Sequence, residues 1–365
     1  MANAVSLTPS SRRPNITTMR TLRTLVVSLC FTFGAHALAA GATAIPSPLA
    51  DLQTQLLRMS SHAPGHVGIA VKDLQTGLMT SVNADANMPA ASTIKIPVMV
   101  EVFRQMQLGR FDLNRVMTLL GRDRDDGYGD LMDARSGSRY PVASLLRAMI
   151  DNSDNTATNM LIRLVGRTNV NHTMTDLGLR DTRLGDDIRS EGNIRSLRSS
   201  PADMVKLLES MAHDRLVDPW SSRAMIAILA GQRHNGLIPA PLPSGMQIAH
   251  KTGTLHDTHN DVGIVYLHGE PYVIAVMTTQ LPTLDSGRRF IRGVSRLAYS
   301  ALARFAAWRE VNPEAVLEAQ PDPQPTPALP VAPDLRMWTP KDASSAVLHG
   351  SEEGYAAPLS LNPSR

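Results

Sequence analysis

The stretch "DVGIVYLHGEPYVIAVMTTQ", residues 261–280, indicates the fold class because it holds two apolar runs on either side of a turn. The turn at 268–271 contains glycine and proline, which is typical of a β-hairpin. Just before it, "MQIAHKTGT" (246–254) predicts a third strand, and "HVGIAVKDLQTGLMTSV" (66–82) predicts a second hairpin with its turn at 73–77. Strands are therefore expected near both ends of a globular part that covers roughly residues 46–310.

Helical periodicity fills the sequence between these strands. Apolar residues recur at helical spacing over 94–106, 142–150, 156–165, 201–211 and 220–229, and a last helix is expected over 287–308. Strands at both ends with helices between and after them predict one antiparallel sheet with an inserted helical subdomain. The fold class is therefore α+β.

Composition restricts the classes of function. The chain has 365 residues, is 43% hydrophobic and carries a formal net charge of only +3. That length allows a full hydrophobic core. Because no basic run with interleaved aromatic residues occurs, we expect no nucleic-acid partner.

The first 40 residues have the pattern of an export signal. Arg20 and Arg23 precede a short apolar run at 25–34, and Ala37-Leu38-Ala39 fits an A-x-A cleavage site. Met19 is a plausible true start. Because the apolar run is too short to span a bilayer, we expect cleavage and a periplasmic or secreted protein, with an uncleaved anchor as the alternative.

The only cysteine, Cys30, lies inside this segment, so the cleaved protein has no thiol for a disulfide, a metal site or a nucleophile. At the other end, residues 321–340 contain seven prolines. Such a segment suits neither a helix nor the interior of a sheet. We expect 311–365 to be a disordered tail, in which Trp338 and Tyr355 are possible docking points.

The segment "ASTIKIPVMV" (91–100) places Ser92 and Lys95 three positions apart where a helix is expected to begin. Residues at i and i+3 share one face of a helix, so the amine can approach the hydroxyl. Free backbone N–H groups at a helix start also stabilise a developing oxyanion. Alone, this pair is equally explained by a helix cap followed by a surface charge.

Two further segments make a catalytic interpretation stronger. "DNSDNTATNML" (151–161) places Ser153, Asp154 and Asn155 in a turn between helices, where they also suit helix capping. "HKTGT" (250–254) places a lysine, a threonine and a glycine on a predicted strand, where the glycine lets a ligand lie close. The three segments together, 61 and 98 residues apart, are not easily explained by chance.

With these three motifs, the sequence resembles the penicillin-recognising serine hydrolases, most closely the class A serine β-lactamases. The likeness runs from about residue 48 to 309 and includes "VGIAVKDLQTG" and "LGRFDLN". The resemblance implies a β-lactamase/transpeptidase-like fold, in which a five-stranded antiparallel sheet flanked by helices joins an all-helical subdomain. It places the site between these two parts.

The resemblance also implies a role for each motif residue. Ser92 is the expected nucleophile, Lys95 its base with a pKa lowered by desolvation and by Lys251, and Ser153 the relay of a proton to the leaving nitrogen. The expected substrate-binding residues are Asn155, Lys251, Thr252, Gly253, Thr254 and Tyr128, with the backbone N–H groups of Ser92 and Thr254 as the oxyanion hole. Tyr128 is equally explained as an ordinary loop tyrosine.

The sequence departs from the class A pattern after Thr182-Arg183-Leu184. Class A enzymes place a deacylating glutamate a few residues later, and here that position falls near Ile188. Glu191 is our candidate for this role, with Asp186 and Asp187 as others, although all three are also explained as solvated loop acids. Loss of such a base slows deacylation, since general-base assistance is typically worth about 10²–10⁴-fold.

We expect no metal and no cofactor, because the histidines, including His256 and His259, show no metal-ligand spacing. No arginine lies on strand 261–267, so Arg288 or Arg289 would have to supply the charge that anchors a substrate carboxylate. Both are equally explained as exposed helix residues.

The sequence therefore predicts an exported, monomeric hydrolase that opens β-lactam rings through an acyl-Ser92 intermediate. One alternative is a D-alanyl-D-alanine peptidase or esterase, which acts on a peptidoglycan-derived substrate. A third is a sensor that binds penicillin or muropeptide without hydrolysing it.

Overall fold

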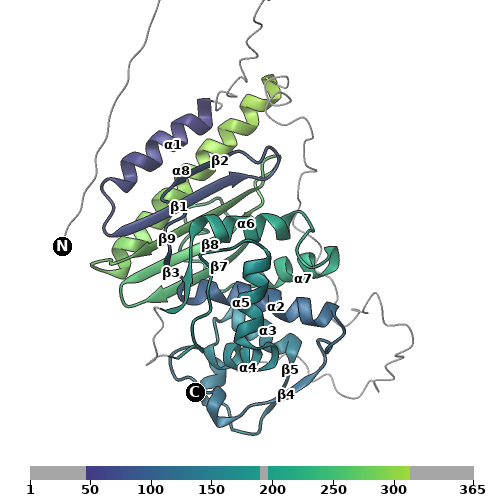
Figure 1. Ribbon diagram of the computed structural model, residues 1–365. Coiled ribbons are helices and arrows are strands. Elements are labelled where there is room, and N and C mark those ends of the chain that lie inside the picture. Colours follow the sequence, from purple (N-terminus) through teal and green to yellow (C-terminus); the bar gives the residue numbers. More distant parts are fainter. Residues whose placement is uncertain (1–46, 190–195, 313–365) are drawn as a thin grey trace, which may run out of the picture. The chain divides into compact units, whose positions relative to one another are not determined.

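Figure 1 shows the computed structural model of the chain, in which residues 47–189 and 196–312 are described. Its centre is a five-stranded antiparallel sheet with the strand order β2-β1-β9-β8-β7. The strands are β1 (His66–Asp73), β2 (Met79–Val82), β7 (Ile248–Leu255), β8 (Thr258–Val265) and β9 (Tyr272–Thr279). Both predicted hairpins and the third strand are confirmed. β8 begins before residue 261 because Thr258 already pairs with Leu255 across a tight turn.

The sheet is covered on both faces. Every residue of β8 and β9 is buried. Because neighbouring side chains of a strand point to opposite faces, this pattern requires a layer on each side. One layer consists of α1 (Ser47–Ser60) and α8 (Leu284–Val311), which lie against each other in Figure 1. Their apolar side chains pack with the sheet in one hydrophobic cluster that includes Leu52, Ile274 and Phe305.

The other face supports the helical part. Its helices are α2 (Lys95–Gln107), α3 (Val142–Asp151), α4 (Asn155–Val165), α5 (Arg167–Asp176), α6 (Pro201–Ala212) and α7 (Pro219–Leu229). They share a second hydrophobic cluster with side chains of the sheet such as Ala275 and Met277. Figure 1 shows α6 next to the sheet and α2 to α5 farther from it. The predicted α+β arrangement with an inserted helical subdomain is therefore confirmed.

Local sequence signals explain where several helices begin. Asp218 and Ser200 each accept a hydrogen bond from a backbone N–H in the first turn of α7 and α6, and proline follows each of them. Thr283 caps α8 in the same way, which starts this helix earlier than the predicted residue 287. The helix continues to Val311.

Two helices were not predicted. α1 buries Leu49, Leu52 and Leu56, which share one face, but this face is covered only because α8 returns from the far end of the chain. α5 is mostly polar and buries Val170 and Met174 as its only fully apolar contacts, so its periodicity is weak.

Two short pairs of strands join segments that are far apart in the sequence. β3 (Met88–Pro89) pairs with β6 (Arg198–Ser199), and the Ala90 N–H donates to the Leu197 carbonyl at 2.8 Å. β4 (Val116–Thr118) pairs with β5 (Arg139–Pro141) in the helical part. The first pair fixes the chain just before Ser92 against the end of the loop that follows residue 184.

Candidate active site

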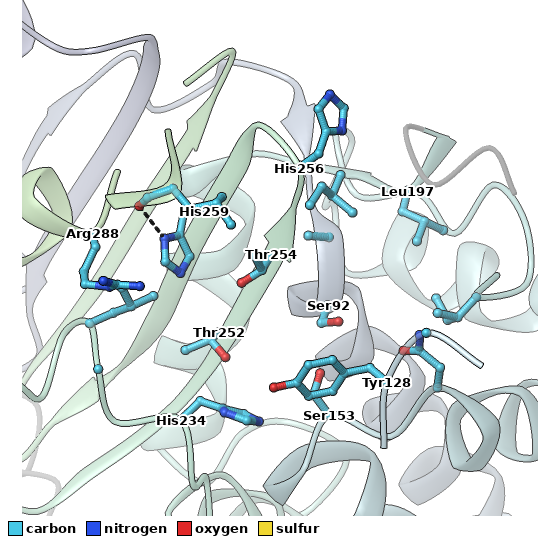
Figure 2. A pocket seen from close by; sticks show the side chains of 18 residues that line it. Ser92, Tyr128, Ser153, Leu197, His234, Thr252, Thr254, His256, His259 and Arg288 are labelled. Atoms are coloured by element: carbon cyan, nitrogen blue, oxygen red, sulfur yellow. Dashed lines mark hydrogen bonds between the residues drawn. The ribbon is translucent and has the colours of Figure 1, made fainter. Parts of the chain in front are cut away.

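A pocket of about 820 Å³ lies where the sheet meets the helical part. Side chains from the three motifs line it, among them Ser92, Ser153, Asn155, Thr252 and Thr254. Figure 2 shows Ser92 and Ser153 near its centre and Thr252 and Thr254 along β7. Segments that are far apart in the sequence therefore converge on one cavity.

Ser92 lies on a single 3-10 turn, Ala91–Ile94, that leads directly into α2. The α-helix begins at Lys95, one residue after the start predicted at residue 94, and Ser92 precedes it. Ala91 has a positive φ of 49°, which is unusual for a residue other than glycine. This sharp entry presents the partly exposed Ser92 to the pocket while Lys95 follows it into the interior.

Lys95 is fully buried and its amine has three acceptors. Nζ donates to the Ser153 carbonyl at 2.5 Å, to Ser153 Oγ at 3.1 Å and to Asn155 Oδ1 at 2.8 Å. The hydrogen bonds of this amine thus join the first motif to the second.

The second motif is held by Asp154, which caps the start of α4, as the sequence also suggested for this segment. Asp154 is fully buried and accepts from the Ala157 N–H and from the Leu131 N–H, both at 2.7 Å. Ser153 itself has a φ of 60°, in the left-handed region. That conformation costs about 1–3 kcal/mol and is typical of functional sites. It turns the Ser153 carbonyl toward Lys95.

Asn155 is fixed on both sides. Its Oδ1 accepts from Lys95, and its Nδ2 donates to Asp125 Oδ1 at 2.7 Å. Its backbone N–H donates to the Tyr128 carbonyl at 2.9 Å, which ties the loop that carries Tyr128 to the start of α4. Tyr128 lines the pocket with half of its surface exposed.

The third motif forms the wall of the pocket on β7. Lys251 is fully buried and its Nζ donates to the Thr252 carbonyl at 3.1 Å, whereas Thr252 and Thr254 line the cavity. A Cβ at Gly253 would approach the Ser92 nitrogen to 3.0 Å and the Ala90 carbonyl to 2.9 Å. Glycine is therefore required for β7 to lie against the serine turn.

Burial shifts both lysines toward the neutral amine. Burial, with a further contribution from the charge of Lys251, places the pKa of Lys95 well below its ordinary value. Burial also lowers the pKa of Lys251 to about 7, although Asp261 and Asp151 oppose this change. A neutral Lys95 amine at neutral pH can accept a proton.

One sequence comparison identifies the family. The model described as "Beta-lactamase enzyme family" matches residues 51–302, which is more than half of the chain. The chain belongs to the β-lactamase enzyme family. Membership identifies it as an enzyme of the β-lactam-hydrolysing class.

Individual relatives agree with this assignment. The extended-spectrum β-lactamase PER-1 of Pseudomonas aeruginosa is 29% identical over 262 residues, which cover 64% of this chain and 80% of that protein. The solved structure of PBP-A is 31% identical with a TM-score of 0.67 and covers 70% of this chain and 97% of its own. A β-lactamase from Sphaerobacter thermophilus is 30% identical with a TM-score of 0.64 and covers 71% and 98%. These matches confirm the expected β-lactamase/transpeptidase-like fold.

In this member of the β-lactamase family, Ile188, near which the class A pattern would place its glutamate, lies in the wall of the pocket. Asn159 holds its backbone twice: Nδ2 donates to the Ile188 carbonyl at 2.8 Å, and Oδ1 accepts from the Ile188 N–H at 2.9 Å. Ile188 is 5% exposed and lines the cavity. Its aliphatic side chain cannot accept a proton.

The acids considered for that role are placed differently. Asp186 is exposed and Asp187 is half-buried; they pair with Arg167 and Arg189, respectively, and neither lines the pocket. Glu191, our candidate, lies outside the described residues.

Arg288 and His259 line the pocket end that lies beyond Thr252 (Figure 2). His259 Nδ1 lies 3.2 Å from the Leu284 carbonyl. Arg288 donates to Asp285 at 3.0 Å, and Arg289 pairs with the same carboxylate without lining the cavity. Of the two arginines considered, Arg288 is the one at the pocket.

The sequence did not identify two residues that line the cavity. His234, from the segment after α7, packs edge-to-face against Tyr128 with ring centroids 5.5 Å apart. Leu197 lies on the opposite side in Figure 2. Both come from segments without a motif, so only the tertiary fold brings them to the site.

Among residues 47–189 and 196–312, no cluster of three or more histidines or acids is arranged to hold a metal ion. Within the same ranges, no helix combines the length and apolar character needed to cross a bilayer.

Proposed function

We propose that this protein opens β-lactam rings with Ser92 as the nucleophile and Lys95 as the base. The observation that carries the proposal is the fully buried Lys95 amine, which has a lowered pKa and lies one turn from Ser92, in contact with Ser153. A neutral amine in this place can take the hydroxyl proton as the serine attacks.

The reaction balances within the pocket. Ser92 Oγ bonds to the lactam carbonyl carbon and its proton passes to Lys95 Nζ. The backbone N–H groups of Ser92 and Thr254 stabilise the negative oxygen. As the C–N bond breaks, Ser153 donates its hydroxyl proton to the leaving nitrogen and receives the proton held by Lys95. The product is an ester of Ser92 with the opened lactam.

Binding of the substrate is assigned to the remaining residues. Lys251, Thr252 and Arg288 supply positive charge and a hydroxyl for the carboxylate that β-lactams carry. Gly253 allows the substrate to lie along β7, and Asn155 and Tyr128 contact its acylamino side. We expect the mature enzyme to act outside the cytoplasm after cleavage near residue 40, and the 311–365 segment to remain a tail.

A second function on the same machinery is favoured by Ile188. Without a carboxylate at this position, hydrolysis of a β-lactam acyl-enzyme is expected to be slow, as in a D-alanyl-D-alanine peptidase or a penicillin-binding sensor. A leucine-to-glutamate variant of PBP-A was solved as an acyl-enzyme complex with penicillin G. That structure supports an acyl-serine route for a relative of this chain.

Intact-mass measurement together with a chromogenic cephalosporin tests the proposal. We expect a mass adduct on the wild-type protein, either transient with continuous colour or persistent after a single burst, and none on Ser92→Ala. Ser60→Ala is the matched control, because Ser60 lies at the end of α1 and outside this pocket. An adduct on Ser92→Ala would disprove the assignment.

A further inference from the structure

The described lining of the pocket offers no carboxylate. It contains serine, threonine and asparagine side chains, one arginine and three histidines, and Ile188 stands where a base was expected. An acyl-Ser92 ester nevertheless needs a proton acceptor for the water that releases it. If Ser92 is acylated, as the proposed function requires, a group on the described walls of the pocket has to accept the proton of this water.

His234 lies on a turn whose hydrogen bonds fix its position at the wall of the cavity. Its backbone N–H donates to Gln232 Oε1 at 3.0 Å, and the Gln232 amide donates to the Ile150 carbonyl at 3.1 Å. The Arg233 N–H donates to the Asp151 carbonyl at 3.1 Å, so both residues before His234 are tied to the end of α3. After it, Asn235 Oδ1 lies 2.9 Å from His250 Nε2 on β7. The turn is thus fixed to α3 on one side and to the sheet on the other.

The His234 ring has an unused nitrogen. Nε2 is buried and has no hydrogen-bond partner among the described residues. A buried polar atom left in this state costs about 1–3 kcal/mol, and such atoms often have a ligand or a catalytic role. Figure 2 shows the ring directed toward Tyr128 and Ser153. Tyr128, whose ring packs against His234, is half exposed and forms the boundary between this ring and the open part of the pocket.

Charges around the ring favour the neutral form, which is the form that can act as a base. Burial lowers the pKa of His234, and the charge of Lys251 lowers it further, against an opposing backbone hydrogen bond with Asn152. The other ring that faces it is Tyr128, and Asp151 at the end of α3 is the nearby acid.

We propose that His234 is the general base that activates the water releasing the acyl group from Ser92. The water oxygen bonds to the ester carbonyl carbon as its proton passes to the imidazole. The tetrahedral intermediate then expels Ser92 Oγ, which receives the proton held by the His234 imidazolium, so that both the imidazole and the Lys95 amine are neutral again. The products are a free carboxylic acid and the regenerated serine.

The position of the His234 ring next to Ser153 favours one class of substrate. His234 approaches from the Ser153 side, where the leaving group departs. In a β-lactam acyl-enzyme the leaving nitrogen stays attached through the remaining ring and obstructs that side. In an acyclic ester, thioester or peptide it diffuses away. The enzyme should therefore release acyclic acyl groups faster than opened β-lactams.

The test uses the full chain with two probes, an acyclic N-acyl-glycyl thioester and benzylpenicillin. With His234→Asn, we expect thioester turnover to fall about 100-fold or more, the usual value of a general base, with the acyl-enzyme accumulating by mass. The rate of acylation by benzylpenicillin should stay near the wild-type rate, which also shows that the variant is folded. His256→Asn is the control, because this exposed histidine lines the same pocket.

A pH profile separates catalysis from a structural effect. Wild-type thioester deacylation should decline as the pH falls below 6.5, the ordinary value for histidine, and this decline should disappear in His234→Asn. Unchanged deacylation in His234→Asn would overturn the proposal, as would an equal loss in Glu191→Gln. If Ser92 forms no adduct with either probe, the proposed function itself fails.

Discussion

At the scale of single residues, the site depends on which atoms each buried side chain leaves free. The hydrogen bonds of Lys95 go to Ser153 and Asn155 and fix its amine in a dry environment. Both carboxylate oxygens of Asp154 accept hydrogen bonds from backbone N–H groups. The motif residues therefore divide into groups that hold the geometry and groups that remain available to a substrate.

Ile188 allows a direct test of how the loop limits turnover. Asn159 holds its backbone from both sides, so the side chain of a substituted residue should occupy the same wall of the pocket. We expect Ile188→Glu to accelerate deacylation of the benzylpenicillin adduct by about 10²–10⁴-fold, because it adds a general base. The lifetime of the adduct measured by intact mass reports this. Ile188→Gln, of similar size and without the charge, should leave the lifetime unchanged, and a comparable gain in it would refute the explanation.

At the scale of elements, the nucleophile depends on the sheet. Asn260 on β8 donates to the Pro89 carbonyl at 2.8 Å and to the Ala90 carbonyl at 3.1 Å, and its Oδ1 accepts from the Thr278 N–H. One buried side chain thus connects two strands to the segment that precedes Ser92. Gly253 supports the same contact from β7.

Removing this connection should affect both stability and chemistry. Asn260→Ala removes the acceptor of the Thr278 N–H and the Asn260 donor of the Pro89 carbonyl, at about 1–3 kcal/mol for a buried group left unpaired, whereas the Ala90 carbonyl keeps its two hydrogen bonds from Thr93. We expect a lower free energy of unfolding in urea and slower acylation of Ser92, because the serine turn loses its anchor. Asn169→Ala provides the comparison, since Asn169 donates to the Val165 carbonyl in the helical part. Normal acylation in Asn260→Ala would show that the turn holds its position without the sheet.

Elements also show what a sequence can and cannot predict here. The hairpins and the three motifs were predictable, because strand alternation, turn residues and spacing are local signals. The α1 helix was missed because its apolar face is covered by tertiary contacts with the sheet and with α8, which lies more than 200 residues away. His234 carries no local signal at all, and the left-handed backbone of Ser153 depends on contacts made by Asp154.

At the scale of the whole molecule, α8 joins the pocket to a buried charge cluster. Its first turns carry Arg288, which lines the cavity, and its last turn carries Arg309, which donates to both oxygens of Glu270 at 2.9 and 2.7 Å. Glu270 is 1% exposed and lies just before β9. Burial raises the pKa of Glu270 to about 9, with a smaller contribution from Asp73, although the hydrogen bond and charge of Arg309 oppose this change.

This carboxyl makes the stability of the fold depend on pH. The folded protein keeps the proton up to about pH 9, whereas the unfolded chain loses it near the ordinary pKa of 4.5. The stabilisation is therefore complete below pH 4.5 and is lost as the pH rises toward 9, by up to about 1.4 kcal/mol per pH unit. Glu270→Gln should become progressively more stable than the wild type from pH 5 to 9, as measured by thermal unfolding.

The control for this prediction is Glu209→Gln, because Glu209 pairs with Lys72 and remains partly exposed. Acylation of Ser92 should be the same in all three proteins at a temperature where each is folded. A constant difference between Glu270→Gln and the wild type across this range of pH would contradict the assignment of the proton to Glu270.

The left-handed backbone at Ser153 has a consequence for how this enzyme would evolve in the laboratory. Glycine adopts that conformation without strain, so Ser153→Gly should stabilise the folded state. The same substitution removes the hydroxyl that is proposed to protonate the leaving nitrogen. Directed evolution that rewards heat resistance alone should therefore enrich glycine at this codon and deliver robust but inert variants. Screening for thermal tolerance would need a simultaneous requirement for turnover to keep serine there.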